Sequence, residues 1–172
     1  MSKPVDNPFK DLIVALCASG VDYIVAGGVA AILHGVPRVT LDLDISVDMR
    51  PENVRRLIQT MSELGLVPRA PVPPETLLHP EAVEKIIKDK GALVFTFIAP
   101  NDALRHVDVF LTRELSYAAL IPESSLRKLD GHDVRVVSAK HLLRLKQAIR
   151  PPRDKDLLDI ATLKKIVERQ DD

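Results

Sequence analysis

The chain has 172 residues and a mass of 19.0 kDa, which is enough for one domain, or a domain with a small helical extension, around a real core. Hydrophobic residues make up 46% and charged residues 28%, a balance that excludes a disordered chain. With 24 basic and 24 acidic side chains and no Trp, neither bulk positive charge nor an aromatic platform is available to bind nucleic acid, although a local basic patch would still serve.

Helices and strands are both predicted along the chain. Apolar periodicity and capping signals predict helices at 8–19 (with Asn7 as the cap and Pro8 in the first position), 29–34, 51–64, 81–89, near 113–119, 139–149 and 154–168. Strands are predicted at 22–26, 41–48, 92–99 and 104–111, the last two as a hairpin, and a further hairpin turns at Asp130-Gly131. Five prolines within 68–80 predict a loop. This order predicts an α/β (α+β) core with a mixed sheet flanked by helices over residues 1–111, and a mostly helical extension over 112–172 packed on it.

The predicted strand 41–48 alternates strictly between apolar and polar residues. Because a strand has a period of two, its polar face carries Asp42, Asp44, Ser46 and Asp48, and the face predicted to enter the core carries Leu41, Leu43, Ile45 and Val47. Carboxylates two residues apart can bind a hard cation such as Mg²⁺ through oxygen. A structural strand with one face in water explains the same pattern, and on the strand alone we favour that explanation.

A glycine pair changes this balance. Gly27-Gly28 joins the strand 22–26 to the following helix, where backbone N–H groups can approach an anion and the start of the helix favours negative charge. Arg38 can donate two hydrogen bonds to a phosphate, and Thr40 can donate one from its hydroxyl. The run after Gly28 lacks both the third glycine of a dinucleotide-binding motif and the Gly-Lys-Ser/Thr of a P-loop. We therefore expect a phosphate site of another kind, close to the acidic strand.

A third carboxylate, Asp108, lies on the polar face of the strand 104–111 together with His106. If this strand pairs beside 41–48, Asp108 lies near Asp42 and Asp44. Three adjacent carboxylates raise one another's pKa unless cations neutralise them, and two-metal sites serve in-line phosphoryl transfer. His106 is expected to touch the same site, and no histidine spacing is typical of zinc.

Together these residues resemble the nucleotidyltransferase superfamily, which has the polymerase-beta-type fold. The resemblance rests on Gly27-Gly28, on the run Arg38-x-Thr40-x-Asp42-x-Asp44, and on the single later Asp108. The stretch GGVAAILHGVPRVTLDLDI is most similar to the AbiEii-type branch, which includes toxins of bacterial toxin–antitoxin systems. Many members have Gly-Ser where this chain has Gly-Gly, a difference that removes one side-chain contact to phosphate and leaves the backbone donors.

The resemblance implies a Mg²⁺-dependent enzyme that moves a nucleoside monophosphate from an NTP, such as ATP, to a hydroxyl acceptor and releases pyrophosphate. Gly27 and Gly28 would hold the triphosphate, Asp42 and Asp44 would bind two Mg²⁺ ions, and Asp108 would complete the metal that activates the hydroxyl. The implied acceptors are the 3′ end of tRNA, a protein side chain and a small molecule, and a toxin would have an antitoxin as protein partner. The alternative is a non-catalytic nucleotide-binding module of the same fold that acts through a protein partner. An unrelated metal-dependent phosphohydrolase would need a water-activating set that we do not find in the sequence.

Two charges in the predicted C-terminal helices fall on apolar stripes. Lys146 lies on the stripe of 139–149, and Asp156 lies on that of 154–168. Because an unpaired buried charge is costly, either the two side chains pair with each other, or Lys146 reaches the triphosphate and Asp156 serves the nucleotide site. We favour the second explanation, since a Lys followed by a segment like Lys155–Asp159 recurs in AbiEii-type sequences. Residues 138–155 carry six Lys or Arg and one Asp, a local excess that could meet a polyanion.

The cysteine content and the hydropathy of the chain indicate the cellular compartment in which the protein is expected. The single cysteine, Cys17, cannot form an internal disulfide or a Cys-based metal site, and its helical spacing is that of a core residue. No apolar run approaches the roughly 20 residues of a membrane span, and the first residues lack the apolar stretch of a signal peptide. We therefore expect a cytoplasmic protein with no membrane partner.

Overall fold

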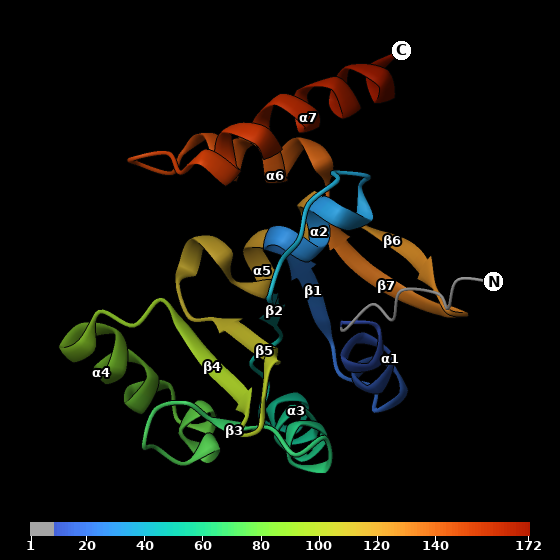
Figure 1. Ribbon diagram of the computed structural model, residues 1–172. Helices are drawn as coiled ribbons and strands as arrows, with labels where there is room; N and C mark the ends of the chain where they lie inside the picture. The colour runs from blue at the N-terminus through green and yellow to red at the C-terminus, as the bar shows by residue number, and fades with distance from the viewer. Residues whose placement is uncertain (1–8) are drawn as a thin grey trace.

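A computed structural model describes residues 9–172 and shows a seven-stranded mixed sheet surrounded by helices (Figure 1). The predicted fold class, a mixed α/β sheet flanked by helices, is confirmed. The strands are β1 Tyr23–Ala26, β2 Asp42–Val47, β3 Val67–Pro68, β4 Val94–Ala99, β5 Asp102–Phe110, β6 Ser124–Leu129 and β7 His132–Val137. The α-helices are α1 Lys10–Ala18, α2 Gly27–Leu33, α3 Pro51–Glu63, α4 Pro80–Lys90, α5 Tyr117–Leu120, α6 Ala139–Gln147 and α7 Asp154–Asp171, and the 3₁₀ turns are η1 Pro74–Leu78, η2 Arg113–Leu115 and η3 Ile121–Glu123. The cap Asn7 and first-position Pro8 expected for α1 lie outside the described residues.

The strands lie in the order β3-β4-β5-β2-β1-β7-β6. At the centre, β2 is antiparallel to β1 and parallel to β5. Both predicted hairpins are present, β4 with β5 and β6 with β7, and the second turns at Asp130-Gly131. This order places the acidic strand β2 directly between the strand that ends at the glycine pair and the strand that carries Asp108.

The core is formed where the apolar face of the sheet meets the stripes of α1 and α3. Leu43 and Ile45 of β2 have no exposed surface, as the alternation predicts. Leu16 of α1 and Leu57 of α3 are equally buried in the same cluster. Each side chain of this kind contributes about 1.5–3 kcal/mol by leaving water, so burial of one face fixes the polar residues of β2 on the other.

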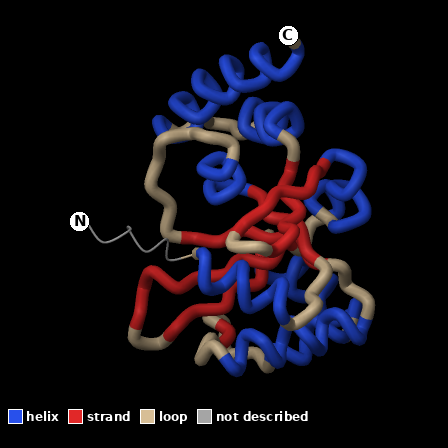
Figure 2. The backbone as a smooth tube through the Cα atoms, turned by 90° about the vertical axis from the view of Figure 1, so that its right-hand side faces the viewer, coloured by secondary structure: helices blue, strands red, loops and turns tan. Residues whose placement is uncertain are grey.

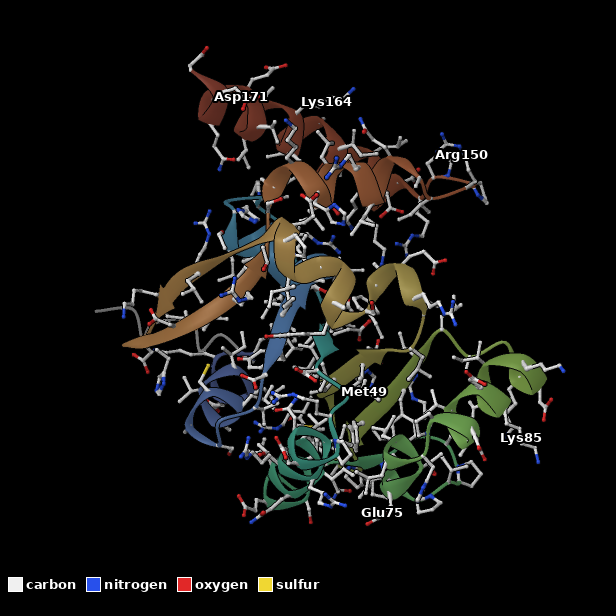
Figure 3. The ribbon with its side chains drawn as sticks, turned by 180° about the vertical axis from the view of Figure 1, so that it is seen from behind. Met49, Glu75, Lys85, Arg150, Lys164 and Asp171 are labelled. Carbon is white, nitrogen blue, oxygen red and sulfur yellow. The ribbon has the colours of Figure 1, made fainter. Side chains whose placement is uncertain are left out.

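The two C-terminal helices, α6 and α7, lie side by side beyond α2, at the opposite end of the molecule from α3 and α4 (Figures 1 and 2). Figure 3 shows Arg150 at the turn between them, and Lys164 and Asp171 pointing outward from α7. The fully buried side chains of α7 are Asp156, Asp159 and Leu163, so charged groups supply much of its contact with the rest of the protein. No helix within residues 9–172 combines the length and the hydropathy that a membrane span requires.

Two details of the predicted elements are corrected. Leu41 is 53% exposed, because β2 begins only at Asp42 and the residue before it belongs to the preceding loop, where strand alternation does not apply. The proline-rich stretch 68–80 is not only a loop. Pro68 ends the short edge strand β3, and η1 forms a 3₁₀ turn that buries Leu77. Proline is tolerated at both places, since an edge strand and a first helical turn do not need its missing N–H.

The sheet also continues past residue 111. Strand β7 pairs in parallel with β1, with Val25 opposite Val136, and β6 forms the outer edge. Residues 124–137 are therefore part of the sheet and not of an appendage packed on it, which corrects the expected extent of the sheet. The helices α6 and α7 lie outside the sheet, and the division of the chain into 1–111 and 112–172 stays a prediction.

Candidate functional site

The three acidic residues singled out in the sequence occur on neighbouring strands. The parallel register of β2 and β5 places Asp44 opposite Asp108 and Asp42 opposite His106. The intervening Leu43 is fully buried on the core side. Asp42, Asp44 and Asp108 therefore project from one face of adjacent strands, and their predicted adjacency is present.

The other polar residues of the predicted strand have structural contacts. The Ser46 hydroxyl is buried and donates to the backbone carbonyl of Leu115 at 2.6 Å. Asp48 lies just past the end of β2 and accepts hydrogen bonds at 3.0 Å from the backbone N–H and the Nε of Arg50. Of the four polar residues on this face, only Asp42 and Asp44 reach the cavity described below.

The glycine pair packs directly against site residues. Gly27 follows β1 and has a φ of +60°, a conformation that favours glycine. A Cβ atom on Gly27 would lie 2.0 Å from a carboxylate oxygen of Asp44. A Cβ atom on Gly28 would lie 2.7 Å from the Thr40 hydroxyl and 3.2 Å from the guanidinium carbon of Arg38. Both positions need glycine because Asp44, Thr40 and Arg38 occupy the space that a side chain would take.

This close contact gives a first prediction. We expect Gly28→Ser to lower the free energy of unfolding by about 1–3 kcal/mol, because the added atoms overpack against Thr40. Thr40→Ala removes the oxygen that lies 2.7 Å from the added Cβ, so the double variant should recover part of that loss. Urea unfolding of the two single variants and the double variant gives the coupling energy. Strictly additive losses would show that Thr40 is not the reason for glycine at this position.

Asp44 is the least compensated of the three carboxylates. Burial first, and then the charges of Asp108 and Asp42, raise its pKa to about 7, despite the opposing attraction of Lys146 and Lys155. Among residues 9–172, no ion pair and no side-chain hydrogen bond reaches the Asp44 carboxylate. A partly buried carboxylate in this position holds its proton up to the neutral range unless a cation is bound beside it.

Asp108 and Asp42 have polar partners. The Thr96 hydroxyl donates to Oδ1 of Asp108 at 2.6 Å and partly offsets the rise in the Asp108 pKa that burial causes. Nδ1 of His106 lies 3.2 Å from Oδ1 of Asp42, and Nη2 of Arg69 lies 3.1 Å from Nε2 of His106. Because Arg69 can only donate, Nε2 accepts and the Nδ1–H of His106 donates to Asp42. His106 therefore contacts the acidic site, as the sequence predicts.

A cavity of about 390 Å³ opens beside these carboxylates. Eight of the nine predicted site residues line it, namely Gly27, Gly28, Arg38, Thr40, Asp42, Asp44, Asp108 and Lys146. Two further cations, Arg153 and Lys155, complete the polar wall, and the apolar wall is formed by Phe110, Leu115, Leu142, Leu145 and Ile149. One cavity thus combines three carboxylates with four cations, a composition suited to a polyanion that carries its own metal ions.

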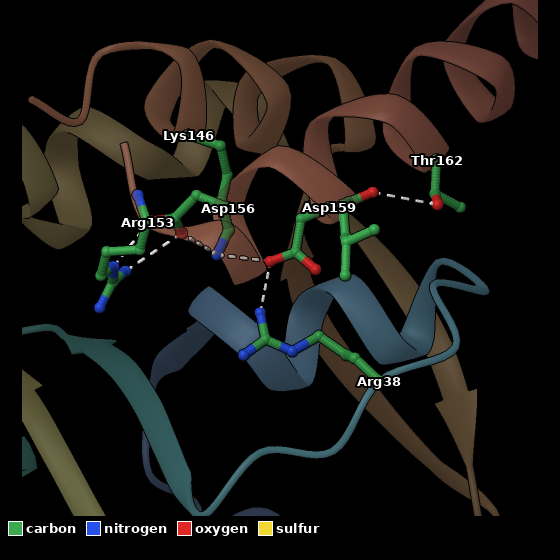
Figure 4. A network of polar contacts seen from close by, with 7 residues as sticks. Arg38, Lys146, Arg153, Asp156, Asp159 and Thr162 are labelled. Atoms are coloured by element: carbon green, nitrogen blue, oxygen red, sulfur yellow. Dashed lines mark hydrogen bonds and ion pairs between the residues drawn. The ribbon is translucent and has the colours of Figure 1, made fainter. Parts of the chain in front are cut away.

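Three of the four cations of this cavity are paired with two aspartates of α7 (Figure 4). Nζ of Lys146 lies 2.9 Å from Asp159 and 3.3 Å from Asp156. Arg38 pairs with the same Asp159 oxygen, and Nε of Arg153 lies 2.6 Å from Asp156. We call Arg38, Lys146, Arg153, Asp156 and Asp159 the charge network. It joins α6, α7 and the segment before β2, and its lysine and two aspartates have side chains at most 8% exposed.

Asp156 is the one predicted site residue that does not line the cavity. It is fully buried in the first turn of α7, where it accepts from the backbone N–H of Arg153 at 3.3 Å. Hydrogen bonds from the Arg153 side chain, the largest cause, lower its pKa to about 2. Arg153 and Lys146 already contact the two carboxylate oxygens, and a direct nucleotide contact for Asp156 stays a prediction. The pairing that the sequence left open is present, while Lys146 lines the cavity as well.

Sequence reasoning did not single out Thr96 or Arg153, and it named Asp159 only as the end of the segment Lys155–Asp159, without a role. Thr96 lies opposite Asp108 in the β4–β5 register, so an aligned hairpin would have identified it. Arg153 precedes Asp156 by three residues, the spacing of a capping box. Asp159 follows Asp156 on the same helix face, but its partner Arg38 is 121 residues away, and no local pattern signals that pairing.

The carboxylates fit a hard cation by their chemistry. In the described part of the chain, no three His, Cys, Asp or Glu side chains already form a gathered metal-binding group. The available donors are carboxylate oxygens, which Mg²⁺ prefers, and Asp44 is partly buried beside two other acids without a paired cation. A divalent ion would relieve this repulsion and draw the three side chains together. Asp42, Asp44 and Asp108 are the residues able to bind it.

No protein-family model and no curated protein matches the sequence, but solved structures do match the fold. The lincosamide antibiotic adenylyltransferase LnuA, solved with lincomycin bound, is 14% identical, with a TM-score of 0.62 over 94% of this chain and 98% of its own. An antigenic nucleotidyltransferase-like protein from Paracoccidioides brasiliensis is 17% identical, with a TM-score of 0.57 over 92% of this chain and 76% of its own. The antibiotic-resistance factor ANT(2'')-Ia is 14% identical, with a TM-score of 0.56 over 94% of this chain and 86% of its own.

The chain therefore has the fold of nucleotidyltransferases, as the sequence resemblance implies. At these identities the likeness establishes the fold, and the activity has to be argued from the residues of this chain. The AbiEii-type branch stays a prediction.

Proposed function

We propose that the protein is a Mg²⁺-dependent nucleotidyltransferase that moves a nucleoside monophosphate from an NTP, such as ATP, to a hydroxyl acceptor. The observation that carries this proposal is the cavity in which three carboxylates from adjacent strands and four cations meet beside a glycine pair. An NTP with its metal ions needs fixed charges of both signs in one place. The fold shared with LnuA and ANT(2'')-Ia supports the same reaction class.

The phosphates are proposed to bind at the cationic and glycine-lined part of the cavity. Gly27 and Gly28 line this part of the cavity, where their backbone N–H groups would donate to a phosphate. Arg38 offers a planar pair of donors, Thr40 offers a hydroxyl, and Lys146 offers an ammonium group. The contacts of Arg38 and Lys146 with Asp159 orient both cations before a nucleotide arrives.

The carboxylates are proposed to act at the reacting end. Asp42, Asp44 and Asp108 would hold two Mg²⁺ ions, which supply charge neutralisation on the phosphates and a lowered pKa for the acceptor hydroxyl. Asp108, fixed by Thr96, orients that hydroxyl and accepts its proton. The hydroxyl oxygen bonds to the α-phosphorus while the bond to the pyrophosphate oxygen breaks, so pyrophosphate leaves with the electron pair. His106 keeps Asp42 oriented through its Nδ1–H.

The acceptor and the biological setting are further parts of the proposal. If the protein belongs to the AbiEii-type branch, we expect it to be cytoplasmic and to have an antitoxin partner. Its acceptor would then be the 3′ end of tRNA or a protein side chain. The cavity is already lined by three cations of the basic run 138–155, namely Lys146, Arg153 and Lys155. Fewer positive charges of this run are therefore left on the surface to bind RNA. This use of the basic run favours a small-molecule acceptor.

Labelled nucleotides test the proposed reaction. The protein is incubated with Mg²⁺ and each NTP labelled at the α-phosphate, together with total RNA, a protein extract or small hydroxyl compounds. We expect label in one acceptor class and release of pyrophosphate, with neither from Asp44→Asn. Label only in free phosphate or free nucleotide would indicate a hydrolase. A thermal shift with Mg²⁺ and NTP but no turnover would indicate the non-catalytic module, and no shift at all would contradict nucleotide binding.

A further inference from the structure

A second cavity, of about 310 Å³, lies at the edge of β4. Its walls come from the segment after β3, from the second half of α4, and from β4 with the residue Ala92 before it. Most of these side chains are apolar, namely Ala70, Val72, Ile86, Ala92, Val94 and Phe95. The polar exceptions are Arg69, Lys90 and Thr96. The sequence showed no recognisable motif in this region.

This cavity is linked to the acidic site by two short series of contacts. Thr96 lines it and donates to Oδ1 of Asp108 at 2.6 Å. Arg69 also lines it, and its Nη2 lies 3.1 Å from His106, which is itself 3.2 Å from Asp42. Asp108 lines the larger cavity, so this carboxylate, with Thr96 behind it, stands between the two. A molecule in the smaller cavity is therefore within one side chain of the reacting end of a nucleotide.

The two cations of the smaller cavity have no carboxylate partner. The Arg69 guanidinium contacts the His106 ring, and its charge also acts on Asp108, but neither Arg69 nor Lys90 forms an ion pair with Asp or Glu within the described residues. Unpaired cations at the rim of an apolar pocket attract an anion and disfavour a cation. A pocket that binds a polycationic acceptor would carry acidic side chains, whereas the charged side chains of this cavity are basic.

We propose that this cavity binds the acceptor, and that the acceptor is a small molecule with an apolar body, a hydroxyl group and an anionic group. The inference rests on the proposed function. The apolar body packs on Val72, Ile86 and Phe95, and the anionic group meets Arg69 and Lys90. The hydroxyl extends past Thr96 into the larger cavity, where it gives its proton to Asp108 as its oxygen bonds to the α-phosphorus and pyrophosphate leaves.

Two probes of nearly the same size test the charge and shape of the site. 4-Hydroxyphenylacetate and tyramine share a phenol ring, and the first carries a carboxylate where the second carries an ammonium group. Each is titrated into the ¹⁵N-labelled full chain saturated with Mg²⁺ and a non-hydrolysable ATP analogue. We expect the carboxylate probe to bind at least about tenfold more tightly than tyramine, the scale of a lost charge-assisted hydrogen bond, with amide shifts at Ala70, Val72 and Ala92.

Variants then assign the effect to the two cations. Arg69→Gln with Lys90→Gln should weaken the carboxylate probe about tenfold and remove its advantage over tyramine. Lys85→Gln, on the outer side of α4 (Figure 3), is the matched control and should leave both affinities unchanged. Equal or tighter binding of tyramine, no binding of either probe, or transfer to RNA that the double variant leaves intact would overturn the inference. Shifts of Gly27 and Gly28 with the ATP analogue alone report on nucleotide binding, so failure of the proposed function is recognised separately.

Discussion

Asp44→Asn should reduce nucleotide transfer by about 10²–10³-fold and, in the absence of metal, should make the folded protein more stable at about pH 8. Activity is expected to fall because the proposed function gives this carboxylate the roles of holding the metal ions and balancing transition-state charge. Stability rises because Asp44, which is partly buried and has no ion-pair partner among the described residues, lies beside Asp108 and Asp42, and an amide of the same size ends that repulsion. Opposite effects on activity and stability are characteristic of a residue placed for function at a cost to the fold.

The pH dependence follows from the sign of the pKa shift. Folding raises the pKa of Asp44 from 3.8 to about 7, so the folded state keeps a proton that the unfolded state releases above about pH 4. Wild-type stability therefore falls as the pH rises through this window, and the loss remains above it. Asn does not titrate, so the variant should gain about 1–3 kcal/mol relative to the wild type between about pH 4 and pH 7.

Thermal melts in EDTA across this pH range measure the gain. Asp133→Asn is the control, since that side chain is 54% exposed and pairs with Lys128 at the far hairpin, and no such pH-dependent gain is expected. An Asp44→Asn variant no more stable than wild type at about pH 8 would contradict the electrostatic argument. A variant that still transfers nucleotide would remove Asp44 from the active site.

Lys146→Ala should lower both stability and NTP affinity. Its ammonium group contacts Asp156 and Asp159, whose side chains are at most 2% exposed, so truncation leaves two buried carboxylates with one cation fewer. Breaking a buried pair usually costs about 3–5 kcal/mol, and we expect about 2–3 here because Arg153 and Arg38 still contact the two acids. NTP affinity should fall by about 1.5–3 kcal/mol if the same ammonium group binds phosphate.

Two further variants separate the contributions of Lys146. Lys146→Met keeps most of the aliphatic chain, so its loss of stability reports on charge and not on packing. Lys140→Ala, an exposed lysine on the same helix, controls for the removal of a positive charge from α6. Urea unfolding gives the stability, and calorimetry with Mg²⁺ and a non-hydrolysable NTP analogue gives the affinity. Reduced affinity with unchanged stability would show that the charge network does not hold α7 in place.

Much of the central sheet was predictable because its signals are local. Strict alternation in β2 correctly separated Leu43 and Ile45 from Asp42 and Asp44, and the Asp130-Gly131 turn correctly located a hairpin. The position of β7 was not predictable, because parallel pairing with β1 joins residues 111 positions apart, Val25 and Val136, and leaves no periodic trace. Strand β3 was not predicted either, because a strand of two residues is too short to show a period of two.

The candidate site was predictable where one face of one element defines it. Helical spacing correctly indicated that Lys146 and Asp156 are buried, and the shared strand face correctly related Asp42 to Asp44. Helical spacing could not show that Asp156 lies behind Lys146 and away from the cavity, because the position of Asp156 depends on how α6 and α7 pack. Nor could it show that Arg38 pairs with Asp159, which is a matter of tertiary contact.

The place of β7 beside β1 has a consequence for the order of synthesis. The glycine pair and all three carboxylates leave the ribosome before His132–Val137, the strand that covers the free edge of β1. Until then the nascent chain presents an apolar strand with an open edge, which readily pairs with other chains. Lys146 follows that strand by less than ten residues, so this cation of the cavity is synthesised almost together with the strand that completes the sheet. We therefore expect a chain that ends before β7 to aggregate instead of folding into a partly formed site.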